Sequence, residues 1–119
     1  MALKNAFNGI KYVFINERNF RIQLILAIIV IIIAFFLKLK SVQLAILVLT
    51  IFLVLFAELI NTALEVIVDM YTKEYNEKAK IAKDISSGAV TLIAIMSVII
   101  GLMVFLPTIL EIYNNINNI

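Results

Sequence analysis

Long apolar runs alternate with short polar stretches along this chain. Three runs are candidates to cross a membrane as helices, and we place the spans at residues 22–37, 42–68 and 85–106. The first span is slightly short, and Phe20 or the residues at 38–40 are expected to extend it. A tight turn at 38–41 separates the first two spans, and a polar loop at 70–84 precedes the third. Pro107 is expected to end the third span. The pattern predicts an all-α membrane protein, with residues 1–119 forming a single membrane domain.

A different pattern occupies residues 1–20, before the first span. Apolar side chains recur there at helical spacing, at Leu3, Phe7, Ile10 and Phe14. An amphipathic helix of this kind lies in the membrane interface. It either anchors the chain or forms one wall of a site at the level of the lipid headgroups. Glu17 and the two arginines near it favour the second role.

The composition supports a membrane protein and excludes several kinds of site. The chain is 64% hydrophobic, whereas soluble domains are about 45–50% apolar. It contains neither cysteine nor histidine, which excludes disulfides, zinc sites, thiol nucleophiles and imidazole bases. The net charge is +2 and the basic residues form no stripe, so a nucleic acid is not an expected partner.

Lysine and arginine are distributed unevenly between the two sides of the predicted membrane. Four precede the first span, four lie in the 70–84 loop, and two lie in the turn at 38–41. Basic residues are retained on the cytoplasmic side. We therefore expect a multi-pass protein of the cell membrane, with its N-terminus and long loop in the cytoplasm and its C-terminus outside.

The second span carries a polar stripe toward its cytoplasmic end, in the sequence E-L-I-N-T-A-L-E-V-I-V-D. The stripe consists of Glu58, Asn61, Glu65 and Asp69. At about 100° per residue, all four fall within roughly 80° of helical arc. Each carboxylate in hydrocarbon costs on the order of 2.5–3.5 kcal/mol, and neighbouring carboxylates repel one another. A divalent cation such as Mg²⁺ or Mn²⁺ is the predicted neutraliser, because hard cations prefer oxygen ligands.

Other groups are expected to converge on the cytoplasmic end of this stripe. Glu17 ends the interfacial helix, and Lys83 and Asp84 lie just before the third span. Carboxylates, a lysine and a helix N-terminus together suit a metal-bound polyphosphate, and phosphoryl transfer needs little beyond positioning and charge neutralisation. Glu58 lies deeper and can accept a proton from a lipid hydroxyl. The chain has no Walker A motif or glycine-rich kinase loop. Three spans cannot enclose two substrates alone, so we expect oligomerisation.

A small proton or ion transporter is the alternative hypothesis, with the carboxylate stripe acting as a relay. A transporter needs polar residues that continue to the far side of the membrane. The outer half of the second span and most of the third are almost entirely apolar. The one-sided stripe therefore favours an enzyme that acts on a substrate in the inner leaflet.

Together with E-Y and A-K-D-I-S-S-G-A-V downstream and I-N-E-R-N-F-R upstream, the stripe resembles the signature of a known family. This family is the small prokaryotic integral-membrane diacylglycerol kinases, which include the undecaprenol kinases of Gram-positive bacteria. The resemblance covers nearly the whole chain. It implies a homotrimeric bundle with composite active sites, in which each site uses residues of two subunits.

The resemblance also implies roles for residues near the reaction. Glu58 matches the proton acceptor, Asn61 a residue near the reacting groups, and Glu17 and Glu65 the glutamates that bind Mg²⁺ and, through it, ATP. Asp69 matches a supporting position. The implied contacts with the nucleotide base, ribose or phosphates are Glu74, Tyr75, Asn76, Lys83 and Asp84, and the implied lipid contacts are Arg21, Gln23, Glu58 and Ser87. Ser86 is interpreted as a helix-packing residue.

The acceptor lipid is either undecaprenol or diacylglycerol. The chain is rich in isoleucine, asparagine and lysine, a composition that resembles proteins from A/T-rich Gram-positive genomes. Members of the family from such genomes usually phosphorylate undecaprenol. We therefore predict undecaprenol kinase activity, with undecaprenyl phosphate as product and diacylglycerol kinase activity, which makes phosphatidic acid, as the alternative.

Overall fold

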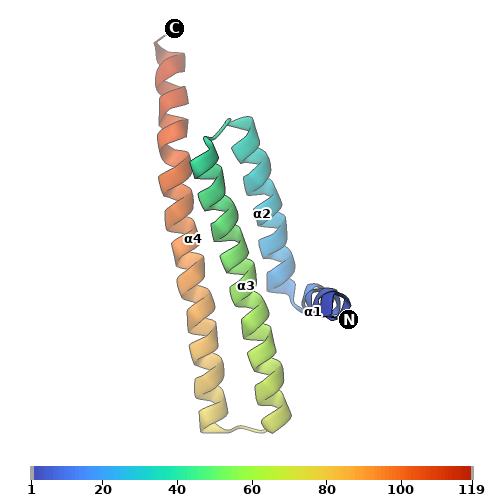
Figure 1. The fold of residues 1–119 in the computed structure, drawn as a ribbon. Helices are drawn as coiled ribbons and strands as arrows, with labels where there is room; N and C mark the ends of the chain where they lie inside the picture. The colour runs from blue at the N-terminus through green and yellow to red at the C-terminus, as the bar shows by residue number, and fades with distance from the viewer. Residues whose placement is uncertain (1, 119) are drawn as a thin grey trace.

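The computed structural model describes residues 2–118 and consists of four helices. Their bounds are α1 Ala2–Asn16, α2 Arg18–Phe36, α3 Ser41–Tyr71 and α4 Glu77–Asn117. Helices α2, α3 and α4 run alongside one another, with α3 in the middle, and α1 lies across them near one end (Figure 1). This arrangement brings α1 and α2 against α3 on one side and α4 against α3 on the other.

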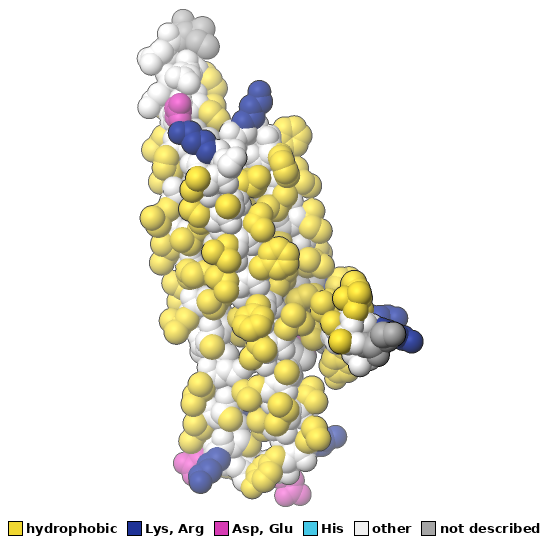
Figure 2. Space-filling model, in the orientation of Figure 1, with side chains coloured by type: hydrophobic (Ala, Val, Ile, Leu, Met, Phe, Trp, Pro, Cys, Tyr) yellow, Lys and Arg dark blue, Asp and Glu magenta, His cyan; other side chains and the backbone are white. Residues whose placement is uncertain are grey.

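Helices α2, α3 and α4 are each long and apolar enough to cross a membrane. Hydrophobic side chains cover the middle of the visible face, while charged side chains gather toward the two ends and on α1 (Figure 2). The predicted all-α class with three candidate spans is therefore confirmed. The helices extend beyond the apolar runs, so that only residues 72–76 separate α3 from α4. Helical hydrogen bonding of the backbone can continue into the polar residues that follow an apolar run.

The prediction that Pro107 ends the third span is wrong. Helix α4 continues through Pro107 to Asn117, past the turn between α2 and α3 (Figure 1). Proline removes a single backbone donor, and such a loss is tolerated within membrane helices. The residues after it form their own hydrogen bonds and carry the helix onward.

The segment predicted as one helix over residues 1–20 is divided at Glu17. This residue adopts an extended conformation, with φ −113° and ψ 108°. Across the junction, Arg21 Nη1 donates to the carbonyl oxygens of Phe14 and Ile15, each at 2.8 Å. These bonds satisfy acceptors that the end of α1 leaves free. Arg21 therefore fixes the turn that sets α1 across α2, and its predicted contact with the lipid remains a prediction.

The three long helices pack around a small apolar cluster. Ala34 on α2, Leu47 on α3 and Val104 on α4 form its buried centre. Ala34 is 1% exposed, and its small side chain allows the helices to approach closely, as is usual in membrane bundles. The cluster holds the three helices together on the side of the molecule away from α1.

Ala34→Leu is expected to destabilise the fold by about 1–3 kcal/mol, because added methyl groups overpack a filled interior. Denaturation by SDS in mixed micelles, followed by circular dichroism, measures this change. The same substitution at Ala45, which is exposed on α3, is the matched control. Equal stability of Ala34→Leu and the unaltered protein would contradict the packing described here.

Candidate active site

The centre of the candidate site is a carboxylate buried within an apolar helix. Glu58 is 3% exposed, although its position on α3 lies among leucine, phenylalanine and isoleucine. The charges of Glu17 and Glu65 both act on this carboxyl group, and both of these residues are half-buried. The structure thus brings together three of the predicted acidic residues, from α3 and from the α1–α2 junction.

The surroundings of Glu58 include one buried acceptor without a partner. The Gln23 side chain on α2 lies against the Glu58 carboxyl group, and its Oε1 atom is buried with no hydrogen-bond partner. A buried polar atom of this kind is costly unless something bonds to it. Thr62, one turn further along α3, donates through Oγ1 to the Glu58 carbonyl oxygen at 3.0 Å. The backbone of the site is therefore held, while the polar atoms of Gln23 and Glu58 can receive a hydroxyl.

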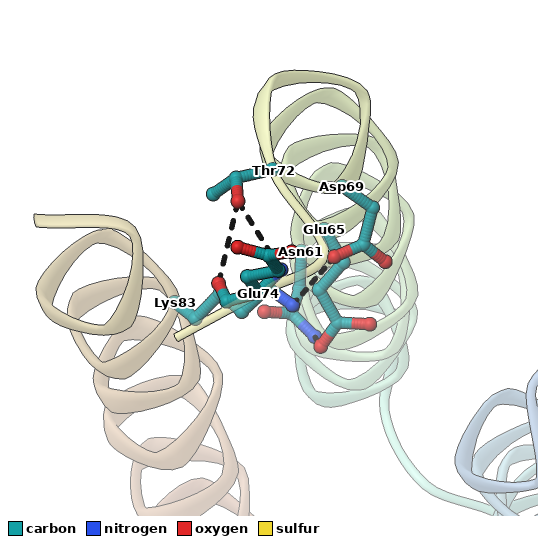
Figure 3. Close-up of polar contacts among 6 residues, drawn as sticks. All are labelled: Asn61, Glu65, Asp69, Thr72, Glu74 and Lys83. Atoms are coloured by element: carbon teal, nitrogen blue, oxygen red, sulfur yellow. Dashed lines mark hydrogen bonds and ion pairs between the residues drawn. The ribbon is translucent and has the colours of Figure 1, made fainter. Parts of the chain in front are cut away.

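Asn61 connects the acidic stripe to α4. Its Nδ2 donates to Glu65 Oε1 at 3.4 Å (Figure 3). Its Oδ1 accepts from Ser86 Oγ at 2.7 Å. The interpretation of Ser86 as a residue that only packs helices missed this contact, because sequence periodicity does not give the register between two helices. Ser86 belongs to the site through Asn61.

A charged pair joins the ends of α3 and α4. Lys83 Nζ lies 2.7 Å from Asp69 Oδ1 (Figure 3). Lys83 and Asp84, the K-D pair matched to nucleotide binding, therefore do not pair with each other. Asp84 pairs instead with Lys80, at 2.6 Å. Exposed pairs of this kind add little stability. The pair of Lys83 with Asp69 places a lysine amine at the end of the carboxylate stripe nearest the α3–α4 loop.

The loop between α3 and α4 borders a small cleft of about 230 Å³. Thr72 Oγ1 accepts from the Glu74 amide at 3.1 Å and donates to its carbonyl oxygen at 3.4 Å (Figure 3). Asn76 caps α4, and its Oδ1 accepts from the Ala79 amide at 3.1 Å. All five residues matched to nucleotide contacts line the cleft: Glu74, Tyr75, Asn76, Lys83 and Asp84. Ser87, matched to the lipid, is exposed on α4.

The carboxylates near Glu58 suit a metal ion that a bound ligand also coordinates. No group of three or more acidic, histidine or cysteine side chains within residues 2–118 can hold a metal by itself. Mg²⁺ in phosphoryl-transfer sites is usually held by one or two carboxylates together with substrate phosphates. Glu17 and Glu65 supply two such carboxylates near Glu58. The residues therefore fit a metal–nucleotide complex rather than a closed protein cage.

Comparisons with known proteins identify the family of the chain. Residues 4–105 match the model of the prokaryotic diacylglycerol kinase family. A diacylglycerol kinase of Synechocystis sp. is 44% identical over 93% of this chain and 64% of its own length, so the match leaves more than a third of that relative uncovered. An undecaprenol kinase of Bacillus subtilis is 41% identical over 77% of this chain and 75% of its own. A diacylglycerol kinase of Escherichia coli is 32% identical over 79% and 77%. This chain belongs to the prokaryotic diacylglycerol kinase family, a family of lipid kinases.

Proposed function

We propose that this protein transfers the γ-phosphate of ATP to the hydroxyl group of undecaprenol in the membrane. The observation that carries the proposal is the buried Glu58 carboxylate, with Glu17 and Glu65 beside it and a cleft lined by lysine and acidic residues at the end of the same helix. The family match and the names of the relatives support lipid kinase activity.

In the proposed reaction, Glu58 accepts the proton of the lipid hydroxyl. The hydroxyl oxygen forms a bond to the γ-phosphorus of ATP, and the bond between this phosphorus and the β,γ-bridging oxygen breaks. ADP leaves with the bonding electrons, and the proton remains on the Glu58 carboxyl group until it is released. The amide N–H of Gln23, whose side chain lies against the Glu58 carboxyl group, donates to the oxygen of the lipid hydroxyl, so that the hydroxyl proton stays directed at Glu58.

Glu17 and Glu65 hold Mg²⁺ together with the phosphates of ATP in this proposal. When bound, the metal neutralises the charge that would otherwise separate the nucleotide from three carboxylates. Asn61 supports Glu65 through its amide. The cleft beside the 72–76 loop holds the rest of the nucleotide, with the Lys83 amine directed to phosphate and Tyr75, which is 84% exposed, available to stack on the base.

The proposal includes a cytoplasmic site and a homotrimer in the cell membrane. Helix α1 and the α3–α4 loop lie toward the same end of the molecule (Figure 1), and eight of the ten lysine and arginine residues belong to these segments or to the starts of α2 and α4. Retention of basic residues inside supports a cytoplasmic location for this end. Large apolar side chains remain exposed along all three long helices, which leaves room for lipid and for two further copies of the chain.

Diacylglycerol is the second candidate acceptor, because the Synechocystis relative at 44% identity is named diacylglycerol kinase. The Bacillus subtilis relative at 41% identity, named undecaprenol kinase, and the composition of the chain support undecaprenol.

Turnover on the two acceptors, measured side by side in mixed micelles, tests the proposal. We expect kcat/KM for undecaprenol to exceed that for diacylglycerol by about tenfold or more, which corresponds to roughly 1.4 kcal/mol of transition-state discrimination. ADP formation is followed with each lipid at saturating Mg-ATP. A preference for diacylglycerol would overturn the acceptor, and no lipid-dependent ADP formation would overturn the kinase activity itself.

A further inference from the structure

Ser86 makes a contact unlike those of other hydroxyl groups in the long helices. Four other hydroxyls each donate to a backbone carbonyl of their own helix, at 2.7–3.0 Å: Thr50, Thr62, Thr91 and Ser97. Ser86 instead donates from α4 across to the Asn61 side chain on α3, at 2.7 Å. The hydroxyl therefore acts on a side chain of the neighbouring helix, at a half-buried position.

The direction of this hydrogen bond follows from the chemistry of Glu65. An ionised carboxylate only accepts hydrogen bonds, so the Asn61 amide must turn its Nδ2 toward Glu65. The amide oxygen then faces Ser86, and Ser86 must be the donor. Asn61 lies directly beside Glu65 (Figure 3). Glu65 thus sets the orientation of the amide, and the Ser86 hydroxyl holds the amide in place from the side of α4.

We propose that Ser86 is a positioning residue, which keeps the N–H of Asn61 directed at Glu65 and thereby supports binding of the nucleotide. The proposal depends on the proposed role of Glu65 in holding metal-bound ATP. Without the hydroxyl, the Asn61 side chain loses its hydrogen bond to α4 and moves between rotamers. Its N–H then leaves Glu65 part of the time, and Glu65 is held less firmly in the pose that receives the nucleotide.

Ser86→Ala is expected to raise KM for Mg-ATP about fivefold and to leave kcat within about twofold, since a neutral hydrogen bond has an effect of this size. Ser97→Ala is the matched control, because it removes a serine hydroxyl from the same helix that bonds only to the backbone. Ser86→Thr restores the hydroxyl and should return KM close to its original value. Equal changes in kcat and KM, or the same KM change in Ser97→Ala, would overturn the proposal.

A nuclear magnetic resonance readout tests the positioning without ATP or turnover. The side-chain amide signals of Asn61 are assigned by their disappearance in Asn61→Asp. They should shift in Ser86→Ala and remain in place in Ser97→Ala. If they shift while the unaltered protein neither binds nor consumes Mg-ATP, the proposed function fails and the positioning role stands. If the unaltered protein is an active kinase and the Asn61 signals do not move, Ser86 has no such role.

Discussion

Glu58→Gln is expected to reduce kcat by about 10²–10⁴-fold, the range that a positioned general base contributes. Glutamine has the size of glutamate but cannot accept the proton of the lipid hydroxyl. KM for Mg-ATP should stay within about twofold, because Glu58 lies deeper in α3 than the residues proposed to hold the nucleotide. Lipid-dependent ADP formation measures turnover, and binding of a fluorescent ATP analogue to the protein in nanodiscs measures affinity.

The stability of this variant separates a chemical defect from a folding defect. A carboxylate in an apolar span is costly, and glutamine replaces it without changing the packing. Glu58→Gln should therefore resist SDS at least as well as the unaltered protein. Glu111→Gln makes the same substitution at an exposed position near the end of α4 and should keep full turnover. If Glu58→Gln weakened nucleotide binding, and kcat at saturating Mg-ATP stayed unchanged, Glu58 would not be the base.

Hydrophobic patterning predicted the number and order of the long helices, because each apolar run is close to or above the length needed to cross the hydrocarbon. The same pattern placed the helix ends less well. Helix α3 reaches Tyr71 and α4 begins at Glu77, since polar residues can continue a helix that an apolar run has started. No glycine or proline marks the break at Glu17 in the sequence. The hydrogen bonds from Arg21 to the carbonyl oxygens at the end of α1 stabilise this break.

Residues of the candidate site on one helix were predictable, and contacts between helices were not. Helical spacing placed Glu58, Asn61 and Glu65 on one face of α3, and the structure places charges and hydrogen bonds among them. The pairing of Lys83 with Asp69 and of Ser86 with Asn61 depends on the register of α4 against α3. That register is set by packing of side chains along both helices, and no spacing within either one specifies it.

Glu65→Gln and Glu17→Gln are each expected to weaken binding of Mg-ATP by about 10–100-fold, because an interaction with a charged group contributes about 1.5–3 kcal/mol. Each substitution removes one of the two carboxylates available to a metal beside Glu58. Titrating Mg²⁺ at a fixed concentration of the fluorescent ATP analogue measures the effect. The half-saturating Mg²⁺ concentration should rise in both variants, while kcat at saturating Mg²⁺ falls less than it does in Glu58→Gln.

Glu77→Gln distinguishes metal ligation from a general change in charge. Glu77 is exposed in the first turn of α4, beside the cleft at the 72–76 loop, and it is not among the charges that act on Glu58. If Glu17 and Glu65 acted only by adding negative charge at this end of the molecule, removing any of the three would strengthen the attraction of ATP and leave the Mg²⁺ requirement unchanged. Because the proposed site uses the two carboxylates as ligands, Glu77→Gln should keep the original half-saturating Mg²⁺ concentration, while this concentration rises in the other two variants. An unaltered Mg²⁺ dependence in both Glu17→Gln and Glu65→Gln would show that the metal is held elsewhere.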